Sequence, residues 1–410
     1  MRLAGRDINR AVTELYEVYG PVFAFGVGPV RFIWFVGPEA NKFALEDAAA
    51  HFQLGPAYGF LRTIGGDTAL ITSDEPEHLR RRRLVQPAFH RSRLEALDEL
   101  LEMRLTALFE SWVGHTVDFY KEVQGRVLAI ICEVLLGRAA LETPLTQDVA
   151  KMMRFANLPF QFQLVKLRVP GSPWARFLAA RSRADAAIYR EIGRRRETGD
   201  SGDDVLGLLL DTKDESGQGL SEREMRDQAI SLVSAGFDTT SAALTWAVYE
   251  LHRQPELLTE LRAELLSADE SPLLAQVIKE TLRLYPPAPA GLRQASRNLV
   301  FGGYHIPAGH PAAFSIYASH RLAAIYPKPL QFKPKRWATF SPPPYSYLPF
   351  GSGARYCIGA GLATRLLTLS LKRLLRDYTL TPLWAEPVAE AGNTLHPRGG
   401  LPVAVKRALG

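Results

Sequence analysis

The sequence has little cysteine and no long apolar run, and each shortage excludes a class of protein. It contains two cysteines in 410 residues, Cys132 and Cys357, which is too few for a disulfide framework. We therefore expect a reducing compartment, the cytoplasm. No segment offers about 18 consecutive uncharged apolar residues, and the polar segment 1–10 does not read as a signal peptide, so we expect no transmembrane anchor.

The chain also lacks a strong charge of one sign and any segment that divides it. It carries 49 Lys and Arg against 43 Asp and Glu, a net charge of +6. Basic residues cluster at 80–83 and 194–196, but no nucleic-acid motif accompanies them, so we expect no nucleic-acid partner. No linker or low-complexity run interrupts a globular composition. We therefore expect residues 1–410 to form a single domain, mainly α with a small β region, and to be a monomer.

Apolar residues at the helical period predict helices over most of the chain. The predicted helices are 7–19, 75–89, 92–112, 119–136, 144–157, 174–196, 221–253, 273–284 and 362–375. The predicted strands are 22–27, 31–36, 301–307 and 395–405, with His396 in a turn. Segments 52–72 and 158–173 are predicted loops; the second is either an apolar entrance lid or a plain connection between two helices.

Four glycines surround Cys357 within segment 347–363. Glycine is used where φ is positive or where another group approaches the backbone closely. The predicted helix that follows has unpaired N–H groups and a partial positive charge at its start, and both favour a thiolate. A lone cysteine is most often an ordinary core residue. The glycine-rich loop instead predicts a thiolate that holds a soft metal from one side.

The middle of predicted helix 221–253 contains residues that disfavour a helix. Gly236 costs about 1 kcal/mol there, and the Asp238 and Thr239 side chains compete for the backbone. A kinked structural helix is one interpretation. The functional interpretation is that Gly236 makes room for a ligand, Thr239 serves a bound oxygen and Asp238 relays protons.

Several motifs together resemble the cytochrome P450 superfamily in its soluble prokaryotic form. The loop Phe350, Gly351, Gly353, Arg355, Cys357, Gly359 and Ala363 resembles the haem-binding loop of that family. Segment 235–240 matches its oxygen-activation signature, and segments 280–283 and 332–337 resemble its Glu-x-x-Arg helix and partner loop. The resemblance covers residues 16–405. It implies the cytochrome P450 fold, a triangular helix-rich domain around one haem b with Cys357 as axial thiolate.

The resemblance also implies a role for each matching residue. The implied cofactor-binding residues are His78, Arg82, Ala235, Arg293, Phe350, Gly351, Arg355, Cys357 and Gly359, of which His78 and the three arginines hold the haem propionates. The implied catalytic residues are Asp238 and Thr239, and the structural ones are Glu280, Arg283 and Arg336. The expected substrate-facing residues are Phe60, Leu61, Leu232, Val233, Ala288, Ala290 and Leu292, with Arg62 in the same region.

The function implied is a monooxygenase that inserts one atom of O2 into an apolar substrate, which we expect to be a terpenoid, steroid or carotenoid-like lipid. Electrons would come from a separate ferredoxin and ferredoxin reductase, steered by a basic patch of Arg80, Arg81, Lys333 and Lys335. The alternatives are an H2O2-dependent fatty-acid peroxygenase and a non-catalytic haem-binding protein. The Asp238–Thr239 pair argues against both.

Overall fold

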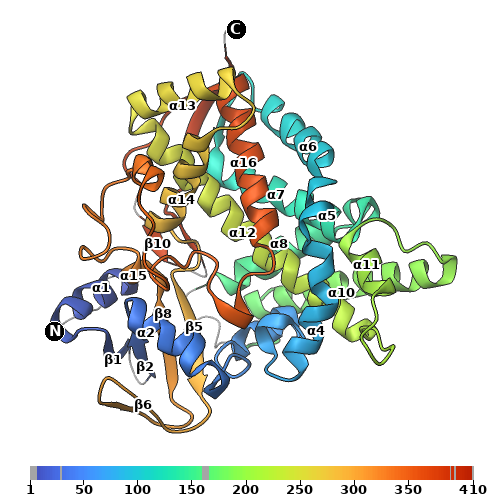
Figure 1. Ribbon diagram of the computed structural model, residues 1–410. Helices are drawn as coiled ribbons and strands as arrows, with labels where there is room; N and C mark the ends of the chain where they lie inside the picture. The colour runs from blue at the N-terminus through green and yellow to red at the C-terminus, as the bar shows by residue number, and fades with distance from the viewer. Residues whose placement is uncertain (1–6, 28–29, 159–165, 388, 392–393, 409–410) are drawn as a thin grey trace.

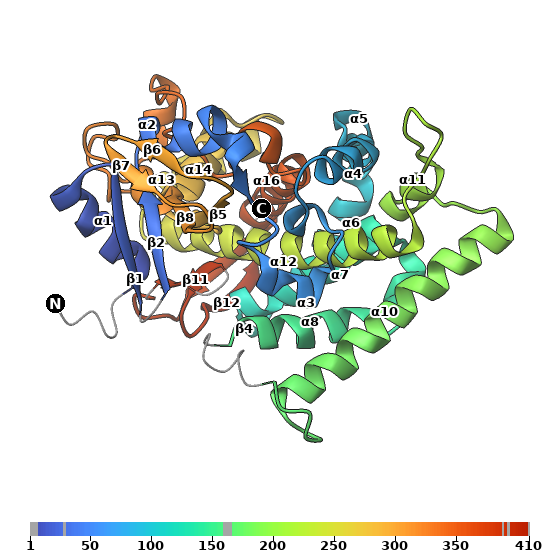
Figure 2. The ribbon, with the colours of Figure 1, turned by 90° about the horizontal axis from the view of Figure 1, so that it is seen from below.

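Helix α12 (Glu222–His252) crosses the middle of the molecule, and the other helices pack around it (Figure 2). The computed structural model describes residues 7–27, 30–158, 166–387, 389–391 and 394–408. The helix begins at a capping box, in which the Ser221 hydroxyl accepts from the Glu224 backbone and the Glu224 carboxylate accepts from the Ser221 backbone. Most of its residues are buried, as expected of a helix surrounded by protein.

Three long helices contact α12 and enclose the centre with it: α7 (Phe119–Leu136), α14 (Pro272–Leu284) and α16 (Ala360–Asp377). The remaining helices cover this core or connect it to the sheets (Figure 1). They are α1 (Ile8–Tyr19), α2 (Pro38–Lys42), α3 (Arg62–Gly65), α4 (Glu77–Val85), α5 (Arg91–Glu95), α6 (Asp98–Glu110), α8 (Leu145–Ala156), α10 (Pro173–Thr198), α11 (Val205–Asp211), α13 (Pro255–Ser267) and α15 (Ile316–Ser319).

The main sheet lies at the edge of the molecule that carries the N-terminal helix α1 (Figure 1). Its strand order is β1-β2-β8-β5-β3, and only the β2–β8 pair is parallel. A second sheet has the order β4-β12-β9, and two hairpins, β6–β7 and β10–β11, complete the β structure. The strands are β1 (Val22–Val27), β2 (Val30–Phe35), β3 (Phe52–Gln53), β4 (Thr116–Asp118), β5 (Ala290–Ala295), β6 (Leu299–Phe301), β7 (Tyr304–Ile306), β8 (Pro311–Ser315), β9 (Tyr378–Pro382), β10 (Ala389–Ala391), β11 (Leu395–Pro397) and β12 (Pro402–Arg407).

The predicted fold class, mainly α with a small β region, is confirmed, but several element boundaries are wrong. Predicted helix 92–112 is divided between α5 and α6, and predicted helix 75–89 ends as a 3-10 turn after Val85. His396 lies in strand β11 rather than in a turn. Segment 52–72 contains β3 and α3. Residues 159–165 of the predicted lid 158–173 lie outside the described residues, and 166–172 form no helix or strand.

Within the described part of the chain, no helix combines the length and the apolar character that crossing a bilayer requires.

Candidate active site

Cys357 lies at the end of the glycine-rich loop, two residues before Gly359, the N-cap of α16. Its backbone N–H donates to the Phe350 carbonyl at 2.9 Å, which closes the loop. Gly351 and Gly353 have φ of 72° and 66°, a region that side chains disfavour. The loop therefore fixes the cysteine by means of its glycines.

Burial raises the pKa of the Cys357 thiol, and the N–H groups of Gly359 and Ala360 and the Arg82 guanidinium counteract this only in part. The helix N-terminus favours the thiolate, as expected, but without a metal on the sulfur desolvation outweighs the nearby positive charge. A metal cation on the sulfur would reverse the balance, since a coordinating thiol loses its proton. The two N–H groups then favour the thiolate further.

A cavity of about 360 Å³ opens beside Cys357, and its walls are mostly apolar. Helix α12 contributes Leu232, Ala235, Gly236, Thr239, Thr240 and Ala243 to the lining. Gly236 also allows α7 to come close, because a Cβ at this position would lie 3.0 Å from the Ile131 Cδ1 atom. Gly236, the residue expected to make room for a ligand, therefore does two things: it lines the cavity and it lets Ile131 of α7 pack closely against α12.

The structure brings many of the predicted site residues to this cavity, from segments far apart in the chain. Those that line it are Leu232, Ala235, Thr239, Ala288, Ala290, Arg293, Phe350, Gly351, Arg355, Cys357 and Gly359. Residues that the sequence reasoning missed also line it, among them Leu45, Leu54, Tyr58, Ile71, Phe89, Ile131, Leu135, Leu282, Phe314 and Ile316. They come from eight or more separate segments, and no local pattern in the sequence marks them.

Four of the expected substrate-facing residues lie elsewhere, for reasons of periodicity and exposure. Val233 is next to Leu232 on α12 but turns into the helical core, where it is 1% exposed. Leu292 alternates with Arg293 in β5 and packs on the opposite face of the sheet, against the cluster around Trp34. Phe60 is exposed, and Leu61 packs against the helical core.

Two arginines line the cavity, and they differ in their anionic partners. Arg293 is 6% exposed, stacks on the Phe314 ring and donates to the Leu292 carbonyl at 2.7 Å. Burial lowers its pKa to about 10, and within the described residues no carboxylate oxygen lies within ion-pair distance of its guanidinium. Arg355 donates to the Ser73 carbonyl at 2.9 Å and lies within ion-pair distance of two carboxylates, Glu75 at 3.5 Å and Asp74 at 3.7 Å.

The other two residues predicted to contact the propionates, Arg82 and His78, do not line this cavity. Arg82, on α4, donates to the Tyr356 carbonyl at 2.8 Å, next to Cys357. His78 is buried one turn earlier on α4, with Nδ1 2.8 Å from Glu75 Oε1. Burial, assisted by the positive charge of Arg355, lowers the His78 pKa, so the imidazole is neutral near pH 7.

These features fit a haem with a thiolate ligand. Cys357 is exposed to the cavity although protein surrounds it, and the walls around it are apolar. Arg293 and Arg355 supply buried positive charge of the kind that binds carboxylates. In the described chain no cluster of three His, Cys, Asp or Glu side chains offers a different metal site.

Asp238 and Thr239 are adjacent in sequence but face different surroundings. Thr239 lines the cavity, and its hydroxyl donates to the Ala235 carbonyl at 2.8 Å. Asp238 is 1% exposed and accepts hydrogen bonds from three neutral groups: Tyr120 Oη at 2.9 Å, Gln124 Nε2 at 2.7 Å and Thr394 Oγ1 at 2.8 Å. Among the described residues, these hydrogen bonds of the buried carboxylate all come from neutral donors.

Glu280, Arg283 and Arg336 form one buried network. The Arg283 guanidinium makes two 2.8 Å hydrogen bonds to the Glu280 carboxylate, and Arg336 Nε donates to it at 3.1 Å. Trp337 Nε1, which the sequence reasoning missed, donates to Glu280 at 2.9 Å. The network also reaches the cysteine loop. Arg283 donates to the His320 carbonyl, and His320 Nε2 accepts from the Leu348 backbone at 2.8 Å.

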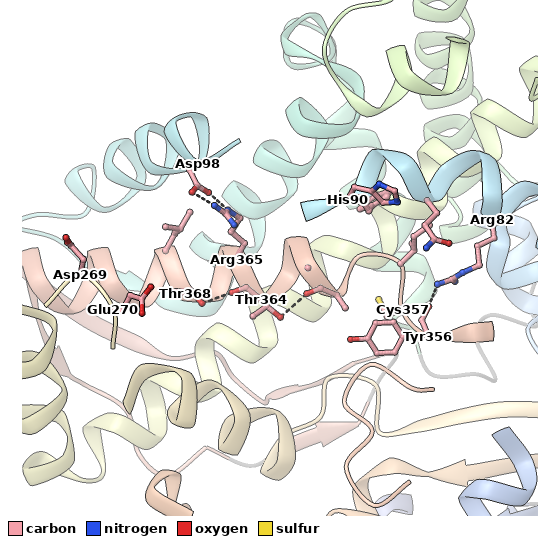
Figure 3. A pocket seen from close by; sticks show the side chains of 16 residues that line it. Arg82, His90, Asp98, Asp269, Glu270, Tyr356, Cys357, Thr364, Arg365 and Thr368 are labelled. Atoms are coloured by element: carbon pink, nitrogen blue, oxygen red, sulfur yellow. Dashed lines mark hydrogen bonds and ion pairs between the residues drawn. The ribbon is translucent and has the colours of Figure 1, made fainter. Parts of the chain in front are cut away.

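A second hollow, of about 840 Å³, also reaches Cys357, and it is lined by residues of α4, the first residue of α6, segment 269–270 and α16 (Figure 3). Its rim carries both signs of charge, with Arg82 and Arg365 against Asp98, Asp269 and Glu270. Arg365 forms a bidentate ion pair with Asp98. The hollow gives an approach to the sulfur side of the site.

Three of the four residues of the expected basic patch are paired with carboxylates. Arg80 and Arg81 both bind the carboxylate of Glu224, a buried residue on α12. Lys335 pairs with Glu260 at 2.7 Å, and both side chains are exposed. The patch is therefore less positive than the sequence alone suggests.

Known proteins resemble this chain over almost its whole length. A family model described as Cytochrome P450 matches residues 2–397. A putative cytochrome P450 139 of Mycobacterium tuberculosis is 33% identical, and the alignment covers 98% of each chain. A cytochrome P450DA haem domain superposes with a TM-score of 0.85 at 25% identity, covering 99% of this chain and 94% of that one. Retinoic acid-bound cyanobacterial CYP120A1 gives a TM-score of 0.86 at 24% identity, covering 96% and 93%.

The family match and the relative agree with the cysteine loop, the apolar cavity and the α12 residues beside it. The chain belongs to the cytochrome P450 family and is a monooxygenase of that family.

Proposed function

We propose that the chain is a haem b enzyme in which Cys357 is the axial thiolate and one atom of O2 enters a C–H bond of an apolar substrate. The observation that carries the proposal is that Cys357 is exposed to a mostly apolar cavity, lined also by Thr239 and by the two arginines Arg293 and Arg355. Bound haem would supply the oxygen chemistry, with the thiolate favouring O–O cleavage. All 410 residues would form one domain around it.

The propionates would be held by Arg293 and Arg355 within the cavity, with Arg82 and His78 supporting them from α4. Guanidinium groups suit this role because their planar fork matches a carboxylate. A propionate would stabilise Arg293 most, because a buried guanidinium without an anionic partner is costly. Ala235, Phe350, Gly351 and Gly359 would lie against the ring, where small or flat groups permit close contact.

Thr239 and Asp238 would deliver protons to the oxygen side of the cavity. The Thr239 hydroxyl can rotate from the Ala235 carbonyl and donate into the cavity. Asp238 would refill it, drawing protons through the hydroxyls of Tyr120 and Thr394, while the Gln124 amide orients the carboxylate. Gln124 is the most accessible of these three donors, so it marks the solvent side of the route.

The substrate we propose is a terpenoid, steroid or carotenoid-like lipid. The described lining outside the cysteine loop is formed largely by Leu, Ile, Phe and Ala side chains, which suit a bulky apolar body. Arg293 and Arg355 are the cavity's cations, and both are assigned to propionates. A substrate carboxylate therefore has no dedicated partner, which disfavours a fatty acid bound by its head group.

Electrons would come from a separate ferredoxin and its reductase, docking over the hollow on the sulfur side of the site. That hollow reaches Cys357 from the surface. A peroxygenase is the second candidate, because the same cavity would serve it. The Asp238–Thr239 pair favours the O2 route, since a relay for protons is needed when O2 is reduced.

One assay separates these functions. The haem-loaded protein is given a lipid substrate with NADPH and a surrogate ferredoxin system, or with H2O2 alone. We expect product and NADPH consumption in the first arm and little product in the second. Product from H2O2 alone would identify a peroxygenase, and no product in either arm across a lipid panel would point to a haem carrier. Spectral titration with isoprenoid alcohols, steroids and fatty acids would test the substrate class.

A further inference from the structure

Four oxidisable aromatic side chains form a continuous series beside the cavity. The rings of Tyr285 and Trp246 stack at 4.1 Å with 7° between their planes. Trp246 meets Tyr249 edge-on at 5.6 Å, and Tyr249 lies 6.2 Å from Trp384. We call Tyr285, Trp246, Tyr249 and Trp384 the aromatic chain. The proposed oxygenation assigns no role to it.

The inner end of the aromatic chain lies next to the cavity on two independent helices. On α12, Trp246 is one turn beyond Ala243, which lines the cavity. On α14, Tyr285 caps the helix one turn beyond Leu282, which also lines it. Three residues of helix advance about 4.5 Å. The stacked pair is therefore roughly one helical turn from the cavity wall on both sides.

The outer end of the aromatic chain reaches the surface. Trp384 is half-buried and lies in a segment whose neighbours Leu383 and Ala385 are exposed. Tyr249, between the stacked pair and Trp384, is 3% exposed. Within the pair, Trp246 is 1% exposed and Tyr285 is half-buried. The series thus leads from the interior to solvent through ring contacts alone.

Each tyrosine in the aromatic chain has a carboxylate that can take its phenolic proton. Tyr285 Oη donates to Glu250 Oε1 at 2.6 Å, and Tyr249 Oη donates to Glu386 Oε1 at 3.5 Å. Burial raises the pKa of the Glu250 carboxyl, so this carboxylate accepts a proton more readily than an exposed one. A core that only needed apolar packing would not require these acceptors.

We propose that the aromatic chain carries electrons from solvent to the cavity, and so removes oxidising equivalents that the site produces when no substrate is consumed. The inference rests on haem binding at Cys357 but not on the identity of the substrate. It adds a protective reductase-like function to the oxygenation.

The electrons and protons balance at each step. The stacked pair gives one electron to the oxidised haem site, and the Tyr285 phenolic proton moves to Glu250. Tyr249 then gives one electron to the pair and its proton to Glu386. Trp384 gives one electron to Tyr249, and a solvent donor of the thiol or ascorbate class gives one electron to Trp384. Each proton returns when its tyrosine is reduced. The net change is one electron taken from the donor and one oxidising equivalent removed from the site.

The test uses haem-loaded protein without substrate, mixed with peracetic acid and freeze-quenched for electron paramagnetic resonance. The variants are Trp246→Phe and Trp384→Phe, which keep an aromatic ring but resist oxidation. The matched control is Trp112→Phe, because Trp112 is equally buried and its ring contacts are Phe109 and Phe119. Haem content is measured first in each variant. Loss of haem binding, which would count against the proposed function, is thereby seen separately.

We expect wild type and Trp112→Phe to give the same organic radical signal, Trp246→Phe to lose most of it, and Trp384→Phe to give a tyrosyl signal in place of a tryptophanyl one. With ascorbate present, Trp384→Phe should lose its haem absorbance severalfold faster than wild type. Peptide mass spectrometry should find oxidised Trp384 in excess of Trp337, which is also half-buried and would report direct attack from solvent. Radical yields and haem survival equal in all four proteins would overturn the inference, as would equal oxidation of Trp337 and Trp384.

Discussion

Cys357 and Cys132 show how much the surroundings of a residue decide its chemistry. Cys132 is buried in the helical core, where desolvation raises its pKa to about 12 and leaves it inert. Cys357 is exposed to a cavity and receives N–H groups from Gly359 and Ala360. The same side chain is therefore packing in one place and a candidate ligand in the other.

Replacing Cys357 by serine should abolish the thiolate signature. We expect the reduced CO complex of the wild type to absorb at the long-wavelength Soret position that gives the family its name, and the variant to lose this band. The reason is that a serine hydroxyl cannot supply the thiolate charge to iron. The control is Cys132→Ser, which alters the other cysteine and should keep the band. A Cys357→Ser protein that retains it would remove Cys357 from the ligand role.

Thr239→Ala should keep haem and substrate binding but lose coupling. Oxygen and reductant would still be consumed, with H2O2 released instead of product, because proton delivery decides between O–O cleavage and loss of peroxide. Thr245→Ala is the matched control, since Thr245 lies on the same helix and donates to the Ser241 carbonyl away from the cavity. The measurement is product and H2O2 per NADPH. Unchanged product yield per electron in Thr239→Ala would refute the assignment.

Thr394→Val tests the buried carboxylate next to Thr239. It removes one of the three donors of Asp238 with little change in side-chain volume. A lost hydrogen bond to a charged group costs about 1.5–3 kcal/mol, so the Asp238 carboxylate should be held less firmly and proton delivery to Thr239 should slow. We expect a larger solvent deuterium isotope effect on product formation than in wild type. An isotope effect and coupling equal to those of wild type would show that protons reach Thr239 by another route.

At the scale of elements, the contact between α4 and the start of α12 depends on the Glu224 carboxylate, which accepts hydrogen bonds from Arg80 and Arg81. Desolvation tends to raise the Glu224 pKa, but the Ser221 backbone N–H, Arg81 and Arg80 lower it from 4.5 to about 2. A carboxyl with a depressed folded-state pKa stabilises the fold above its unfolded pKa. This contribution is lost as the pH falls from about 4.5 to about 2. Arg82 directly follows Arg81 on α4, so the contacts of Arg80 and Arg81 with Glu224 hold the part of the helix that carries Arg82.

Glu224→Gln should therefore lower the free energy of unfolding at pH 7 by about 2 kcal/mol. The difference from wild type should shrink as the pH falls below 4.5, the usual value for this carboxyl. Urea titrations at several pH values measure both effects. Glu222→Gln is the control, because Glu222 pairs with Arg196 in solvent, where ion pairs contribute little. Equal losses in the two variants, or a difference that persists at low pH, would contradict this account of the contact between α4 and α12.

At the scale of the whole molecule, the position of the electron donor depends on which charges remain free. Lys333→Glu with Lys335→Glu should slow reduction by ferredoxin and flatten its dependence on ionic strength, because steering by exposed charges is screened within about 10 Å at 0.1 M salt. Arg194→Glu with Arg196→Glu, on α10 at the far edge of the molecule, should leave the rate unchanged (Figure 1).

The remaining pair of the expected patch should behave differently. Arg80→Glu with Arg81→Glu should lower stability, because both arginines bind Glu224. Its reduction rate is informative only after stability has been measured. If the Lys333 and Lys335 double variant is reduced at the wild-type rate with the wild-type salt slope, the donor docks elsewhere and the predicted patch is wrong.

The sequence by itself determined the features that depend on local chemistry. Glycines with positive φ around Cys357, the capping box of α12 and the residues that disfavour a helix at its centre are visible as short patterns, because backbone geometry restricts which residue fits. The helical period of the apolar residues and the order of the family motifs were sufficient to predict the mainly α fold. Helix 92–112 was predicted unbroken because its apolar period continues across the gap between α5 and α6.

Only the tertiary structure decided what depends on contacts between distant segments. It showed that Leu292 faces away from the cavity, that Asp238 meets Thr394, and that Arg80 and Arg81 are held by Glu224. It also showed that burial outweighs the helix N-terminus at the Cys357 sulfur. Desolvation and pairing depend on every group that surrounds a side chain, and those groups come from parts of the chain that no local pattern connects.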